Sequence, residues 1–106
     1  MKHAMKSVVL GLSLLLANGS IAHAQDFEKG YEATEKGDYA TALKEWRPLA
    51  EQGNADAQYN LGLIYNNGHG VTQNFNEAVN WFRLAAIQGK AEAQYNIGTM
   101  YLKGKG

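Results

Sequence analysis

The residues of this chain that could act as nucleophiles or metal ligands lie almost entirely in its first 24 positions. The 106-residue sequence has no cysteine, and its three serines and two of its three histidines fall within residues 1–24. The remainder therefore lacks the usual serine and cysteine nucleophiles and keeps one histidine, His69. A structural or catalytic zinc ion needs three or four ligands. We expect no catalytic residue, no metal site and no cofactor in residues 25–106.

Two glycine-bracketed loops, GHG at residues 68–70 and GKG at residues 104–106, raise the question of phosphate binding. A P-loop has the form GxxxxGK followed by Ser or Thr, placed between a strand and a helix. No Ser or Thr follows Lys105, no strand is predicted before it, and the matching position of the first loop is His69. Both loops are interpreted as turns, with His69 as a solvated side chain.

Carboxylates are the remaining groups capable of acid–base chemistry. Asp56 and Glu92 occupy matching positions, and Glu45, Glu51 and Glu77 fall on predicted helices. Nothing in the pattern brings two of them together in a cleft, as general acid–base catalysis would need. We expect these side chains to be solvated on helix surfaces.

Residues 1–24 have the pattern of a secretory signal peptide. Lys2 and Lys6 precede an apolar run, residues 7–17, which is shorter than the ~20 residues of a membrane-spanning helix. Ala22 and Ala24 then form a small-x-small cleavage pattern. We expect cleavage after Ala24, export to the periplasm or the extracellular medium, and no membrane span after cleavage.

The charge of the exported part does not indicate binding to nucleic acid. Removal of Lys2 and Lys6 leaves eight basic against ten acidic residues, a net charge of −2. Proteins that bind nucleic acid usually carry a basic patch or stripe, which the pattern does not predict here.

An internal repeat of 36 residues organises the rest of the chain. The segment ADAQYNLG at residues 55–62 recurs as AEAQYNIG at residues 91–98, and 14 of 33 positions are identical between residues 38–70 and 74–106. Self-similarity at this period is typical of solenoid proteins, in which each repeat is one supersecondary unit.

Each repeat is predicted to contain two helices. Apolar residues recur at helical spacing in residues 74–89, with Asn74 or Asn76 as N-cap, and Asp38 would cap the matching helix of residues 38–53. Pro48 lies inside that helix, where we expect a kink or an early end near Arg47. Gly62 and Gly98 fall within the other helix of each copy, and a repeated glycine there suggests close approach of a neighbouring helix.

These patterns predict an all-α protein: a short α-solenoid of antiparallel helix pairs, with about five helices after the signal peptide. A divergent leading helix pair would occupy residues 25–53, a full repeat residues 54–89 and a truncated repeat residues 90–106. The apolar edge of Ile97 and Tyr101 would lack a covering helix. We expect truncation of a longer array, with self-association through this open C-terminal repeat as the alternative.

Four amide residues recur at matching positions and are the candidate partner-binding residues. They are Gln58, Asn60, Gln94 and Asn96. One interpretation is that they hydrogen-bond adjacent loops and hold repeat against repeat. The other is a ladder of amides facing a partner protein. The aromatic residues of the repeats are expected to be core residues rather than binding anchors.

The motif AxAQYNLGxxYxxGxGVxxNxxEAVxWFRxAAxQG of residues 55–89 resembles the Sel1-like repeat, a relative of the tetratricopeptide repeat. The matching positions are Ala55, Ala57, Leu61, Gly62, Tyr65, Gly68, Gly70, Val71, Ala78, Trp81, Ala85, Ala86 and Gly89. Asn74 stands where the family usually has Asp. The resemblance covers nearly all of residues 25–106.

This resemblance implies a non-enzymatic scaffold or adaptor that binds an unidentified protein partner, in the bacterial periplasm or secreted fraction. Some secreted, cysteine-rich relatives bind or hydrolyse β-lactams. The alternative function is therefore a small envelope hydrolase or ligand-binding protein that acts on cell-wall material or β-lactams.

Overall fold

The structure is a computed structural model that describes residues 26–106, which form helices and the loops that join them. The helices are α2 (Phe27–Glu35), α3 (Tyr39–Glu51), α4 (Ala55–Asn67), α5 (Phe75–Ile87) and α6 (Ala91–Leu102). The predicted signal peptide, residues 1–24, lies outside the described residues.

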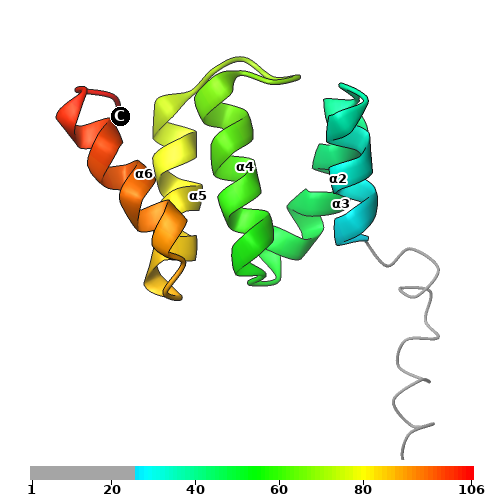
Figure 1. The fold of residues 1–106 in the computed structure, drawn as a ribbon, viewed down its shortest axis with the longest axis horizontal. Coiled ribbons are helices and arrows are strands. Elements are labelled where there is room, and N and C mark those ends of the chain that lie inside the picture. Colours follow the sequence, from blue (N-terminus) through cyan, green and yellow to red (C-terminus); the bar gives the residue numbers. More distant parts are fainter. Residues whose placement is uncertain (1–25) are drawn as a thin grey trace, which may run out of the picture.

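The helices stack in chain order. Each helix packs against the next one, and the contact between α4 and α5 is the most extensive. Figure 1 shows this order from the α2–α3 pair at the right of the view to α6 at the left. The predicted all-α solenoid of five helices is confirmed for this part of the chain. None of the helices between residues 26 and 106 has the length and apolar character that crossing a bilayer requires.

Four of the five described helices begin at a side-chain cap, and three of these caps have the same geometry. Asp38, Asn54 and Asn74 each accept a hydrogen bond from the backbone N–H three residues further on, at 3.1, 2.8 and 3.0 Å respectively. These bonds satisfy donors that a helix start leaves without an intrahelical partner. The predicted caps at Asp38 and Asn74 are confirmed. The helix α6 instead begins after Lys90, whose side chain makes no capping bond.

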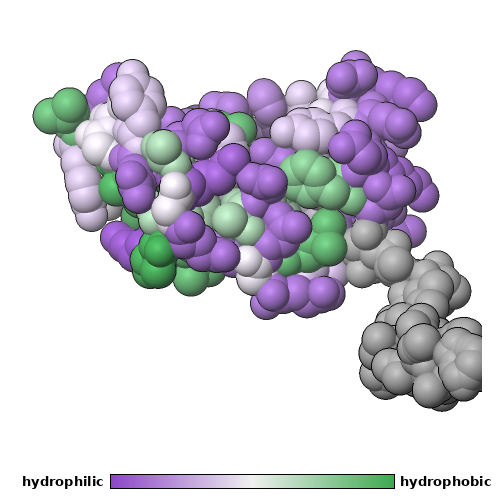
Figure 2. Space-filling view, turned by 60° about the horizontal axis from the view of Figure 1, so that its bottom comes forward, coloured by the Kyte–Doolittle hydropathy of each residue, from purple (hydrophilic) through white to green (hydrophobic). Residues whose placement is uncertain are grey.

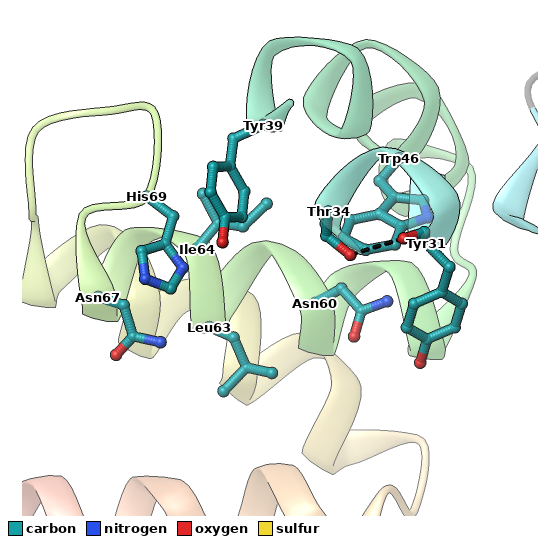
Figure 3. Close-up of a pocket in the computed structure, with 9 residues that line it drawn as sticks. All are labelled: Tyr31, Thr34, Tyr39, Trp46, Asn60, Leu63, Ile64, Asn67 and His69. Atoms are coloured by element: carbon teal, nitrogen blue, oxygen red, sulfur yellow. Dashed lines mark hydrogen bonds between the residues drawn. The ribbon is translucent and has the colours of Figure 1, made fainter. Parts of the chain in front are cut away.

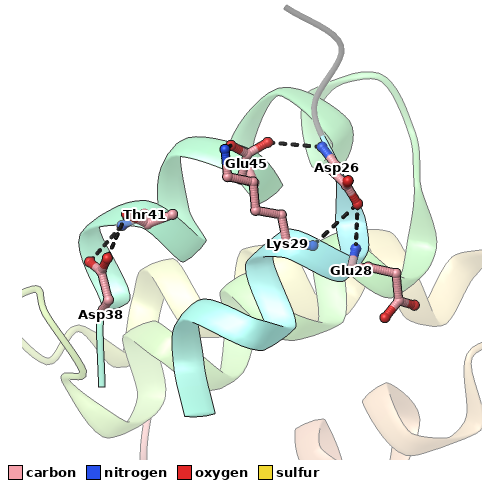
Figure 4. A network of polar contacts seen from close by, with 6 residues as sticks. All are labelled: Asp26, Glu28, Lys29, Asp38, Thr41 and Glu45. Carbon is pink, nitrogen blue, oxygen red and sulfur yellow. Dashed lines mark hydrogen bonds and ion pairs between the residues drawn. The ribbon is translucent and has the colours of Figure 1, made fainter. Parts of the chain in front are cut away.

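The start of α2 is held by two carboxylates, the exposed Asp26 and the buried Glu45 (Figure 4). The side chain of Asp26 accepts hydrogen bonds from the backbone N–H groups of Glu28 and Lys29, and its own backbone N–H donates to Glu45 at 2.8 Å. Glu45 is only 8% exposed and also pairs with Lys29 at 3.6 Å. The expectation that Glu45 is a solvated carboxylate is therefore wrong, because this side chain fastens α2 to α3.

Pro48 does not end its helix. The helix α3 continues through the proline to Glu51, so of the two outcomes expected near Arg47 the early end is wrong and the kink stays a prediction. Proline removes one backbone hydrogen bond and crowds the preceding turn. Trp46 and Ala50, one on each side of Pro48, are almost fully buried, at 2% and 1% exposed. Packing on both sides of the proline keeps the last turn helical.

Two glycines let bulky rings approach the backbone of a neighbouring helix. A Cβ atom added to Gly62 would lie 2.5 Å from the ring of Phe82, and one added to Gly30 would lie 2.3 Å from Nε1 of Trp46. Real side chains do not tolerate such distances, so only glycine fits at either position. The close helix approach predicted at Gly62 is confirmed. Gly30 of α2 allows an equally close approach by Trp46 of α3.

The core has two clusters that share α4. One joins buried residues of α2, α3 and α4, and the other joins those of α5 and α6 with partly buried residues of α4. The expectation that all repeat aromatics are core residues is wrong for Tyr95 and Tyr101, which are 73% and 59% exposed on α6. On the face shown in Figure 2, apolar residues lie in small groups among hydrophilic ones.

Candidate functional site

The two predicted glutamines make the same bond in each repeat. Gln58 Nε2 donates to the carbonyl of Ala50 at 3.0 Å, and Gln94 Nε2 donates to the carbonyl of Ala86 at 3.1 Å. Each bond ties one helix of the repeat to the end of the preceding helix. This use favours the interpretation that these amides hold repeat against repeat.

Gln58 also helps to link the turn after α3 to the turn after α5. Its Oε1 accepts a hydrogen bond from Gln88 Nε2 at 2.9 Å, and the same Gln88 nitrogen donates to the carbonyl of Gly53 at 2.9 Å. The Gln58 side chain is buried, and both of its polar atoms are paired within the chain. It therefore presents no free group to a partner in this arrangement.

The two predicted asparagines lie in different surroundings. Asn60 is 6% exposed, and its Nδ2 has no hydrogen-bond acceptor. Asn96, its counterpart on α6, is half-buried. The structure therefore does not bring the four predicted amides into one ladder facing outward. Partner binding by any of them stays a prediction.

Asn60 lies in a groove formed by α2, α3, α4 and the loop after α4 (Figure 3). The groove has a volume of about 220 Å³. It is lined by Tyr31, Thr34, Tyr39, Trp46, Asn60, Leu63, Ile64, Asn67 and His69. In this view the Asn60 amide lies between the Tyr39–His69 pair on one side and the Tyr31–Trp46 pair on the other.

One wall of the groove is an aromatic pair built by α2 and α3. The rings of Tyr31 and Trp46 meet edge to face with centroids 5.4 Å apart, and Phe27 packs on Tyr31 in the same way at 5.1 Å. The Trp46 indole N–H donates to the carbonyl of Phe27 at 3.0 Å, which satisfies its only polar atom. Gly30 leaves the space this ring occupies. The Trp46 ring of this wall is therefore held by contacts within the chain.

The opposite wall comes from the GHG turn, a feature that sequence reasoning missed. His69 stacks on Tyr39 with ring centroids 4.6 Å apart, and Gly70 lies so close that an added Cβ would be 2.6 Å from Tyr39. The second copy repeats this arrangement with Lys105 placed 5.1 Å over the ring of Phe75. The sequence held a signal for this wall, because the pairs Tyr39–His69 and Phe75–Lys105 are related by the 36-residue offset. His69 is exposed, as expected, but it is not an isolated loop side chain.

The groove is almost free of charge. None of its nine lining residues is Asp, Glu, Lys or Arg, and the two groups of residues 26–106 with displaced pKa values lie elsewhere. Hydrogen bonds from Thr41 lower the pKa of Asp38, and a hydrogen bond to Asp56 raises the pKa of Lys90. Within residues 26–106 no group of three or more His, Cys, Asp and Glu side chains is arranged to hold a metal ion. The arrangement suits binding of uncharged groups better than acid–base catalysis.

Comparison with known proteins agrees with this repeat geometry. A family model described as the Sel1 repeat matches residues 55–90 and 91–106. This chain is a Sel1 repeat protein. The second matched segment corresponds to α6, and the first to α4 and α5 together. No curated protein matches the chain.

Two solved Sel1-type structures share the fold. One is a protective antigen of uropathogenic Escherichia coli strains with an SLR fold, 40% identical over 74% of this chain, with a TM-score of 0.69. The other is a Sel1 repeat protein from Oxalobacter formigenes, 40% identical over 73% of this chain, with a TM-score of 0.66. The match spans 18% of the first protein and 33% of the second. Sel1 repeats generally mediate protein–protein interaction, and proteins built from them are typically non-enzymatic.

Proposed function

We propose that this Sel1 repeat protein is a non-enzymatic scaffold that binds a partner protein through the groove of α2, α3 and α4. The observation that carries the proposal is the groove itself, a hollow with aromatic walls and no Asp, Glu, Lys or Arg, formed by packed helices. Aromatic side chains contribute large contact areas to protein interfaces at little cost in conformational entropy. A surface that is already ordered also loses little freedom when a partner binds.

The site of action that we propose is the periplasm or the extracellular medium. Support comes from the charged start, short apolar run and small-x-small pattern of residues 1–24. N-terminal sequencing of protein recovered outside the cytoplasm should begin at Gln25. Full-length protein that stays in the cytoplasm would contradict this part of the proposal.

Site-directed photo-crosslinking in cells tests the scaffold function. A benzophenone amino acid at Asn67, an exposed residue that lines the groove, should yield a discrete protein adduct identified by mass spectrometry. The matched control is Glu51, which is exposed at the end of α3 and does not line the groove. We expect no adduct of the same mass there. Absence of any protein adduct from a scan of exposed positions on all five helices would contradict the scaffold function.

A further inference from the structure

The outward face of α6 is largely apolar. Tyr95, Gly98 and Leu102 recur on it at helical spacing, and Tyr95 and Leu102 are 73% and 89% exposed. A shallow hollow of about 470 Å³ on this face is lined by Gln94, Tyr95, Gly98, Thr99, Tyr101 and Leu102. Among the described helices, α6 packs chiefly against α5, on its opposite side (Figure 1). A contiguous exposed apolar patch of this kind is typical of an interface.

The matching face of α4 is already an interface with a helix. Tyr59 and Gly62 correspond to Tyr95 and Gly98 at the 36-residue offset, and both lie against the ring of Phe82 on α5. The rings of Tyr59 and Phe82 have centroids 5.7 Å apart. At Gly98 an added Cβ would meet nothing within 4 Å. The same close approach of a helix is therefore possible on α6.

Two charged residues indicate which helix fits. Glu92 and Lys103 lie at opposite ends of α6, separated by about three whole turns, so they share one side of the helix. Both are exposed. In two antiparallel copies of α6 with a two-fold axis at Gly98, each Glu92 faces Lys103 of the other copy, and each Tyr95 faces Leu102. A parallel pair would instead place like charges together, which is unfavourable.

We propose that two copies of this chain form an antiparallel dimer through α6, with Gly98 at the two-fold axis and Glu92 of each copy paired with Lys103 of the other. One helix face per copy is small compared with the interface of a permanent dimer, so the association should be weak and depend on concentration. None of the nine groove residues lies on α6. The inference is therefore separate from partner binding in the groove, and either can fail alone.

Sedimentation equilibrium of the purified full chain tests the dimer. A reversible monomer–dimer equilibrium should be seen between about 10 μM and 1 mM, and Tyr95→Arg should raise its dissociation constant at least about ten-fold. The matched control is Leu84→Arg, on α5, where the side chain is 46% exposed and does not line the hollow. It should dimerise like the native chain. A monomer at every concentration, or a dimer that Tyr95→Arg leaves unchanged, would overturn the inference.

Exchange of the charges tests the antiparallel arrangement. Glu92→Lys and Lys103→Glu should each weaken the dimer by about three- to ten-fold at low salt, because each turns both ion pairs into like-charge contacts. The double variant, and an equal mixture of the two single variants, should regain the native affinity. These differences should shrink in about 1 M salt. Far-UV circular dichroism should stay unchanged, since both side chains are exposed. A double variant as weak as the single ones would overturn the inference.

A single cysteine tests the position of the axis. The native sequence contains no cysteine, so an introduced thiol can form a disulfide only with a second copy. Residues at the axis lie close to their own counterparts, as a disulfide with Cα atoms about 4.4–6.8 Å apart requires. Gly98→Cys should therefore form a covalent dimer on non-reducing gels faster than Glu51→Cys, an exposed position on α3. Equal rates for the two variants would contradict the dimer described here.

Discussion

The helices α4 and α6 begin with nearly the same residues, ADAQYNLG and AEAQYNIG, but their surroundings differ. Six residues of α4 are buried, against two of α6. Among the described helices, α4 packs between α3 and α5, while α6 packs against α5. Burial is therefore set by the neighbours a repeat meets, and not by its own motif.

The glycine shared by the two helices shows the difference most clearly. Phe82 of α5 lies directly on Gly62 of α4, whereas a Cβ added to Gly98 of α6 would meet nothing within 4 Å. A glycine inside a helix costs about 1 kcal/mol relative to alanine. At Gly62 that cost is offset by close packing of the ring. At Gly98 no described neighbour offsets it.

Removal of the ring on Gly62 should have the largest effect. Phe82 is fully buried, so Phe82→Ala deletes its apolar contacts and leaves a cavity along α4. We expect a loss of about 3–5 kcal/mol in the free energy of unfolding, measured by urea denaturation. The control is Leu84→Ala on the same helix, where the side chain is 46% exposed and the change should stay within about 0.5 kcal/mol. Similar losses in both variants would contradict the close packing of Phe82 on Gly62.

The paired glycine substitutions should give opposite signs. Gly62→Ala forces a methyl group to within 2.5 Å of the Phe82 ring, and overpacking of this kind costs about 1–3 kcal/mol. Gly98→Ala meets open space and should stabilise the protein by about 0.5–1 kcal/mol through helix propensity. Thermal and urea unfolding of the two variants would measure both changes. A stabilising Gly62→Ala would mean that α5 is not held tightly against α4.

Most of the fold could be predicted because the repeat pattern is local. The 36-residue offset, the caps at Asp38 and Asn74, and the close approach at Gly62 all follow from residue types at fixed spacing. The failures depend on tertiary contacts. The helix continues past Pro48 because the residues on both sides are buried, and Glu45 is buried because it binds the start of α2.

The candidate site was predicted only in part. The sequence pattern selected Asn60, but it grouped this residue with Gln58 and Gln94, whose donors are bonded within the chain. The wall formed by Tyr39 and His69 was missed, because the two residues lie 30 positions apart in the sequence and the 36-residue offset marks equivalent positions without showing that they meet. Repeat symmetry identifies equivalent positions. It does not show which of them remain unpaired after folding.

The residues that precede α4 and α6 should differ by a smaller free energy of unfolding. Asn54 accepts a hydrogen bond from the third residue of α4 at 2.8 Å, so Asn54→Ala should cost about 1 kcal/mol in the free energy of unfolding. Lys90 occupies the equivalent position before α6 and makes no side-chain capping bond. Lys90→Ala should therefore cost less than Asn54→Ala in the same urea titration. A larger loss at Lys90 would show that its ion pairs matter more than a cap.

Those ion pairs give the smallest expected effect, and it depends on pH. Lys90 Nζ lies 2.7 Å from Asp56 of α4 and 3.7 Å from Glu92 of α6, and the hydrogen bond to Asp56 raises the pKa of Lys90 above 10.5. A raised lysine pKa stabilises the folded state fully below 10.5, and this stabilisation is lost as pH rises through the higher folded pKa.

The Asp56 side chain is 59% exposed, so solvent screening should limit the contribution to a few tenths of a kcal/mol, about the value of a surface ion pair. Thermal unfolding between pH 9 and pH 11.5 should show a decline that is shallower in Asp56→Asn, because that variant lacks the charge that holds the Lys90 proton. Glu51→Gln, an exposed change away from Lys90, should keep the full decline and serves as the control. Identical pH profiles for the native chain and Asp56→Asn would mean that the two helices are not joined electrostatically at their starts. The difference between α4 and α6 would then rest on the packing around Gly62 and on the cap at Asn54.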